Sequence, residues 1–391
     1  MLLKTPHIKT FLLLKKAVYP ATLLFLTACI PGAIHAQVPV LSSYPEAEAT
    51  LFMDFDGHTV TGSVWNWSGP INAQPAELSN NAIREIFNRV SEDFRPFNLN
   101  VTTDSTAYLA APYNKRMRII VTETSNWYGS AGGVSMVGSF TYGDETPCWV
   151  FSTLLGNNPK VVAEAISHEA GHTLGLQHQS DYDSQCKRVA EYGVGTGTGQ
   201  IGWAPIMGVG YYRNLTTWHN GSSVIGCNYI QNDLEIIASA NNGFGYRTDD
   251  HANDAGDATK IKMEGTGFLV DGIINRTGDI DAFQVNINSP ANFQLNAIPE
   301  NVGSGNNGAN VDIRIRILNA FKDTIGLYNP STLLDAGIDT ALNSGTYYVL
   351  VDGVGNANKS EYGSLGYYSM TGMVNAVLPL HQFKLRGSSA A

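Results

Sequence analysis

The chain has few charged residues and few long apolar runs. Of its 391 residues only 15% are charged, and 24 lysines and arginines face 34 aspartates and glutamates, which gives a formal net charge of −10. A protein with this negative charge binds nucleic acid or anionic membranes poorly, so we expect neither as a partner. After the N-terminal segment no apolar run is long enough to span a membrane.

Cysteines are also scarce. Only four are present, and no two of them have the Cys-x-x-Cys spacing of a cysteine zinc site. If Cys29 is set aside with the N-terminal segment, an odd number remains. Cys186 and Cys227 flank a glycine-rich turn around Met207, so we expect these two to form a disulfide. Cys148 is then expected to be a buried, small apolar residue.

The N-terminus has the composition of an export signal. Lysines up to Lys16 precede the apolar stretch 17–28, which is too short for a stable membrane span. This predicts a signal peptide cleaved after Ala36. Alternatively, the sequence Leu-Thr-Ala-Cys ending at Cys29 resembles a bacterial lipobox, which would anchor the protein through a lipid on that cysteine. We therefore expect a secreted protein, with a lipoprotein as the alternative.

The most informative run begins at His168 and reads His-Glu-Ala-Gly-His-Thr-Leu-Gly-Leu-Gln-His. His168 and His172 are four positions apart, so on a helix they share a face and can bind one ion. Gly175 can end that helix with a positive φ and bring His178 to the ion as a third ligand. Glu169, beside the first ligand, is placed to take a proton from water. Three protein ligands leave one position open, the arrangement of a catalytic rather than a structural Zn²⁺.

This run resembles the signature of metzincin zinc endopeptidases, a group that includes reprolysin-like and bacterial secreted enzymes. The resemblance implies a methionine turn beneath the metal, and residues 204–212, with Met207 as the apolar floor, look like that turn. In some metzincins a tyrosine two positions after this methionine reaches the metal. Here that position is Val209, so the nearest candidates to support the transition state are Tyr211 and Tyr212.

The first half of the chain mixes strand and helix patterns. Apolar spacing predicts strands at 50–57, 99–103 and 116–122, and helices at 80–94, from 159 through the histidine run, and at 232–240. This order indicates an α+β fold, a mixed sheet with helices packed on it. The metzincin resemblance implies the same fold, and it implies an edge strand for substrate at 132–140. A glycine-rich loop is the alternative for that segment.

The last third of the chain has the pattern of an all-β domain. Apolar and polar residues alternate strictly over 311–317, and 345–353 is a second strong strand, which indicates a β-sandwich. This part resembles the bacterial pre-peptidase C-terminal domain through 278–283 and the Gly-Thr-Tyr-Tyr strand. The predicted organisation is therefore a signal peptide at 1–36, a zinc peptidase domain at 37–245, a linker at 246–259, a β-sandwich at 260–376 and a tail at 377–391.

The predicted sandwich also has aspartates in turn-like segments. Oxygen ligands suit Ca²⁺, so four of them could form a calcium site, whereas turn aspartates without metal are the alternative. These residues are Asp279, Asp281, Asp312 and Asp352.

The motif predicts a zinc endopeptidase that acts on proteins or peptides, with Glu169 as general base. Together with the N-terminal segment this indicates a secreted enzyme, which we expect to be a monomer. Two alternatives remain open. The same residues could hydrolyse a glycosylated or non-protein substrate, or the fold could serve as a non-catalytic adhesin or binding module.

Overall fold

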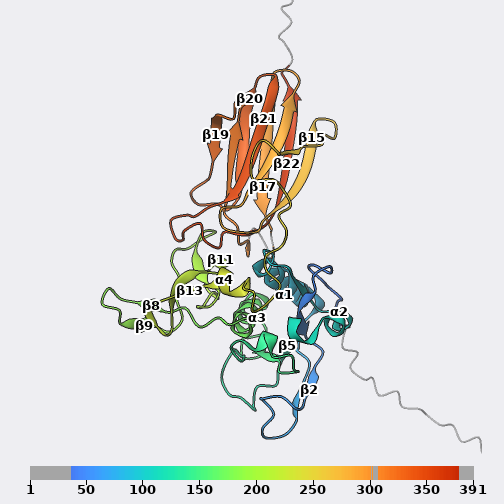
Figure 1. The fold of residues 1–391 in the computed structure, drawn as a ribbon, viewed down its shortest axis with the longest axis vertical. Coiled ribbons are helices and arrows are strands. Elements are labelled where there is room, and N and C mark those ends of the chain that lie inside the picture. Colours follow the sequence, from blue (N-terminus) through green and yellow to red (C-terminus); the bar gives the residue numbers. More distant parts are fainter. Residues whose placement is uncertain (1–36, 301, 303–306, 378–391) are drawn as a thin grey trace, which may run out of the picture. The chain divides into compact units, whose positions relative to one another are not determined.

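A five-stranded mixed sheet organises the first half of the fold (Figure 1). In spatial order its strands are β4 (Leu99–Thr102), β1 (Ala49–Asp54), β5 (Arg116–Thr122), β7 (Cys148–Phe151) and β6 (Gly133–Val134). The first four run parallel, and β6 pairs with β7 in the antiparallel sense at one edge. Every residue of β1 is buried, as expected for a central strand covered on both faces.

The computed structural model describes residues 37–300, 302 and 307–377. The predicted signal peptide, the lipobox cysteine and the tail beyond residue 377 lie outside these residues. None of the helices within the described ranges is long and apolar enough to cross a membrane.

Two longer helices pack against each other beside this sheet. They are α1 (Asn80–Asp93) and α3 (Pro159–Thr173). The Ser79 side chain caps the start of α1, and Asn158 caps α3, where Pro159 occupies the first turn without losing a hydrogen bond. The buried face of α1 carries Ile83, Ile86 and other apolar residues into the main core. The predicted mixed sheet with packed helices is thus present.

Shorter elements connect these parts and follow α3. They are α2 (Ser105–Ala110), α4 (Asp233–Ile237), 3₁₀ turns at Tyr113–Lys115 and Ser139–Thr141, and four strand pairs: β2 (His58–Val60) with β3 (Ile71–Ala73), β8 (Asp181–Tyr182) with β9 (Arg188–Ala190), β10 (Trp203–Pro205) with β11 (Leu215–Thr217), and β12 (Asn220–Ser223) with β13 (Gly226–Asn232). A disulfide joins Cys186 to Cys227, as predicted from their positions, and it fits a protein exported to an oxidising compartment. Cys148 is free and buried, also as predicted.

Two further sheets form the predicted β-sandwich. One has the order β14 (Thr259–Lys260), β16 (Ile280–Ile287), β21 (Gly345–Gly353), β18 (Ile313–Leu318) and β19 (Thr324–Tyr328). The other has the order β15 (Gly267–Ile274), β22 (Gly366–Ala376), β17 (Ala291–Pro299) and β20 (Ala336–Leu342). Alternate residues of β18, at 313, 315 and 317, are buried between the sheets while the arginines between them face outward.

Polar contacts join the sandwich to α1. The amide of Asn310 donates to the Asp93 carboxylate over 2.7 Å, and the Tyr367 backbone N–H donates to Glu92 over 2.9 Å. Both carboxylates are buried, so each depends on these donors for the hydrogen bonds that water would otherwise supply.

Candidate metal centre

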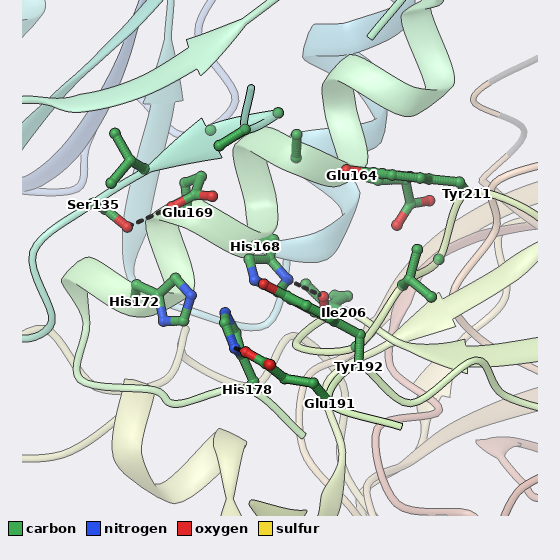
Figure 2. A pocket seen from close by; sticks show the side chains of 18 of the residues that line it. Ser135, Glu164, His168, Glu169, His172, His178, Glu191, Tyr192, Ile206 and Tyr211 are labelled. Carbon is green, nitrogen blue, oxygen red and sulfur yellow. Dashed lines mark hydrogen bonds and ion pairs between the residues drawn. The ribbon is translucent and has the colours of Figure 1, made fainter. Parts of the chain in front are cut away.

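The three histidines of the motif converge in the structure. His168 and His172 project from adjacent turns of α3, and Gly175, at φ 106°, turns the chain so that His178 returns to them. One ring nitrogen from each lies within 4.8 Å of the corresponding nitrogens of the other two. Figure 2 shows the three rings facing a common point. The sequence therefore predicted correctly which side chains come together.

Each ring is held through its Nδ1 atom. His168 Nδ1 lies 2.8 Å from the carbonyl oxygen of Ile206, and His172 Nδ1 lies 2.7 Å from that of Leu176. His178 Nδ1 lies 3.3 Å from a carboxylate oxygen of Glu191. Because a carbonyl or carboxylate can only accept, Nδ1 must carry the proton, and the Nε2 lone pair of each ring is left for a metal. This donor set fits Zn²⁺.

The charge state of the rings supports the same conclusion. Burial, and then the neighbouring His172, lowers the pKa of His168 to about 3, and burial lowers the pKa of His172 to about 4. The pKa of His178 is also lowered by burial. All three rings are therefore neutral near pH 7, as metal ligation requires.

Glu169 projects from α3 beside these rings, into the same cleft. The Ser135 hydroxyl donates to its Oε2 atom over 2.7 Å, and burial raises the pKa of this carboxyl to about 7. A Cβ on Gly133 of β6 would lie 2.6 Å from the Glu169 Cγ atom. The edge strand thus packs directly against the Glu169 side chain, which also lines the cleft.

Met207 lies against α3 at Gly171, next to His172 in the sequence. A Cβ on Gly171 would lie 2.6 Å from its sulfur, so only glycine permits this close approach. Met207 is fully buried, and its carbonyl accepts from the Gln179 backbone N–H over 2.9 Å. It therefore occupies the apolar position under the histidine-bearing helix that the sequence predicted.

The cleft around these groups has a volume of about 770 Å³. Among the described residues that line it, the charged ones apart from histidine are all acidic, and they are Glu164, Glu169 and Glu191. The residues 132–135, which include β6, form one wall of the cleft, and the segment 206–211 forms another. The segment 132–140 is thus partly an edge strand, of two residues, and partly a turn.

The tyrosines expected near the metal are placed differently from one another. Tyr211 lines the cleft, and burial raises its pKa to about 12, whereas Tyr212 is 83% exposed and does not line it. Of the two tyrosines, only Tyr211 therefore faces the cleft. Sequence reasoning missed Tyr192, whose ring centroid lies 4.3 Å from that of His178. It also missed Glu191, because neither residue has a fixed spacing from the histidine motif.

The four aspartates expected to form one calcium site do not come together. Asp281 pairs with Val351 across β16 and β21, so the next residue, Asp352, points to the opposite face, where it binds Arg314. Asp312 instead accepts from Asn356 over 2.8 Å. Another group, which consists of Asp249, Asp250 and Asp281, has carboxylate oxygens within 4.8 Å of one another.

No protein-family model matches the chain, and no curated protein matches it. Among solved structures, the pre-peptidase C-terminal domain of a collagenase from Bacillus anthracis is 14% identical, with a TM-score of 0.22, over 29% of this chain and 93% of that one. The lysozyme inhibitor PliG of Aeromonas hydrophila is 9% identical, with a TM-score of 0.22, over 30% of this chain and 96% of that one.

Proposed function

We propose that this protein is a secreted zinc endopeptidase of the metzincin type. The observation that carries the proposal is the set of three histidines whose Nδ1 atoms all have partners and whose rings converge, with Glu169 in the same cleft. His168, His172 and His178 would hold one Zn²⁺. When bound, the ion would polarise a substrate carbonyl and acidify water.

Glu169 would act as general base and then as general acid. It would take a proton from water as the water oxygen forms a bond to the peptide carbonyl carbon. It would then return that proton to the amine nitrogen as the carbon–nitrogen bond breaks. Water is the only co-reactant, so Ser135 needs no nucleophilic role and is left to orient the carboxylate through its hydrogen bond.

An extended peptide would bind along β6. This strand is the outermost of its sheet, and its residues Gly133 and Val134 line the cleft beside Glu169. An exposed strand edge offers main-chain hydrogen bonds to an extended chain, whatever its side chains. This geometry favours a peptide over a compact non-peptide substrate.

Two other functions use the same residues in different ways. A hydrolase for glycosylated or non-protein substrates would keep the metal and Glu169 but would not cleave plain peptides. A binding module would need neither Glu169 nor an open ligand position. A substrate survey with a matched variant separates these three functions.

The test is cleavage of a diverse peptide library, read by mass spectrometry, with zinc-loaded wild-type protein and the Glu169→Gln variant. The proposal predicts cleavage by the wild type and a loss of at least about 10³-fold in the variant, with equal zinc content. Equal cleavage by both proteins would remove Glu169 from the mechanism. No cleavage by zinc-loaded wild type would favour the other two functions.

We also propose that the carboxylates of Asp249, Asp250 and Asp281 bind Ca²⁺ in the sandwich. The Oδ1 atom of Asp281 is buried and has no hydrogen-bond partner among the described residues, so a cation there would satisfy it. Added Ca²⁺ should raise the Tm of the wild type but not that of Asp281→Asn. Asp312→Asn, outside the cluster, should keep the wild-type response, and an equal response in all three proteins would contradict the site.

A further inference from the structure

Tyr192 has a position in the cleft that the mechanism above does not use. Its ring stacks at an angle on His178, with centroids 4.3 Å apart, and lies 6.1 Å from the ring of His168. Figure 2 shows the side chain running from the cleft wall toward the three histidines, with its hydroxyl end beside His168. The side chain is 42% exposed, so the hydroxyl can meet a bound substrate.

The segment that carries Tyr192 is fixed on both sides. Before it, the Ser180 hydroxyl donates to the Glu191 carbonyl over 2.5 Å, and the Glu191 carboxylate contacts His178. After it, the Gly193 N–H donates to the Gln179 carbonyl over 2.8 Å, and the Gly193 carbonyl accepts from the Val209 N–H over 2.9 Å. These contacts fix the backbone on both sides of Tyr192, and the contact of its ring with His178 directs the side chain before substrate arrives. Electrostatic catalysis requires such positioning in advance.

The other hydroxyls of the cleft are placed less well for this role. Among the described residues that line the cleft, the remaining ones are those of Tyr128, Ser135 and Tyr211. The Ser135 hydroxyl already donates to Glu169. The ring of Tyr128 contacts Trp127 and Phe151, and Tyr211 lies with Glu164 on the far side of His168 from Glu169 (Figure 2).

We propose that Tyr192 is a catalytic residue whose phenolic O–H donates a hydrogen bond to the oxygen of the reacting carbonyl. This inference rests on the proposed peptidase function. As the water oxygen bonds to the carbonyl carbon, the carbonyl oxygen gains negative charge, and a donor aimed at it stabilises that charge. The tyrosine keeps its proton throughout, and no bond of its side chain forms or breaks.

The test compares the Tyr192→Phe and Tyr128→Phe variants with the wild type on one cleaved peptide. Phenylalanine retains the ring that stacks on His178 and removes only the hydroxyl. We expect Tyr192→Phe to lower kcat by about 10²- to 10³-fold, the usual effect of losing one such donor, with KM within about twofold of wild type. Tyr128→Phe should stay within about threefold in kcat, and both variants should bind one zinc per chain.

A second readout does not depend on turnover. A phosphinic peptide has a tetrahedral, charged oxygen in place of the reacting carbonyl, so its affinity reports contacts made in the transition state. By calorimetry, Tyr192→Phe should bind it at least about tenfold more weakly than wild type, with binding of the cleaved product unchanged. Loss of product and phosphinate affinity together would indicate a structural role and overturn the inference.

The outcomes separate this inference from the proposed function. If the wild type cleaves peptides and Tyr192→Phe does so equally well, only the role of Tyr192 is overturned. If the zinc-loaded wild type cleaves none and does not bind the phosphinic peptide, the proposed function and this inference both fail.

Discussion

Replacement of Gly133 by alanine should disable Glu169 without removing the metal. Gly133 does not have a positive φ, so its backbone can accept alanine. However, the added Cβ would lie 2.6 Å from the Glu169 Cγ, 2.8 Å from its Oε1 and 2.7 Å from the backbone oxygen of Trp149. That oxygen belongs to β7, which pairs with β6, so relief of all three contacts needs a shift of β6 at Gly133 as well as a movement of the Glu169 side chain.

The expected magnitude follows from these distances. Ordinary carbon contacts are near 3.5–4 Å, so the carboxylate must move by about 1 Å, and a misplacement of that size can cost about 10²-fold in rate. Extra volume in a packed site costs about 1–3 kcal/mol of stability, so the variant should still fold. His168, His172 and His178 are not among the atoms approached, so zinc affinity should not change.

The assay is kcat/KM on a cleaved peptide, with zinc content and Tm measured on the same samples. Gly132→Ala is the matched control, because its Cβ would meet the side-chain end of Leu155 at 2.8 Å, and that end can rotate away. We expect Gly132→Ala to keep at least about a third of the activity, a loss of less than about 1 kcal/mol in transition-state stabilisation. Full activity in Gly133→Ala would refute the placement of Glu169 against β6.

Three further predictions concern stability and the remaining thiol. Loss of the Cys186–Cys227 bridge, 41 residues apart, should lower the free energy of unfolding by up to about 4 kcal/mol, as measured in urea for the double serine variant. Burial raises the pKa of Asp93 above its usual value of 3.8. The protonated carboxyl therefore stabilises the fold fully below pH 3.8, and this stabilisation is lost as the pH rises through the pKa of the folded state. The side chain of the Asp93→Asn variant cannot ionise. Between about pH 5 and pH 9 the free energy of unfolding should therefore fall by at least about 1.4 kcal/mol more in the wild type than in the variant, and an equal fall in both would contradict this. The Cys148 thiol is 0% exposed and burial raises its pKa, so iodoacetamide should label it only after unfolding.

The sequence was sufficient where function depends on short, regular spacing. His168 and His172 are fixed on one face by the helical repeat, and Gly175 supplies the positive φ that returns His178 to them. The alternating pattern of 311–317 predicted a strand with one buried face, and β18 has it. Such features depend on residues close together in the sequence, so they can be predicted from one sequence.

The sequence was insufficient where distant segments meet. Asp249 and Asp250 lie in a stretch that looks like a linker, yet they join Asp281 about thirty positions later. Asp352 was expected beside Asp281, but it pairs with Ile280, one residue away, so the alternation of side chains along the strands places it on the opposite face of the sheet. The position of Tyr192 depends on a loop that is held by hydrogen bonds from other segments, and no local sequence pattern predicts these bonds.

The most direct test of the central claim is a zinc titration of metal-free protein followed by the rate of peptide hydrolysis. If His168, His172 and His178 hold one catalytic ion, the rate should rise linearly and stop at one equivalent of zinc. Glu169→Gln should bind the same equivalent and stay inactive. Hydrolysis without zinc, or equal hydrolysis by the variant, would contradict the account.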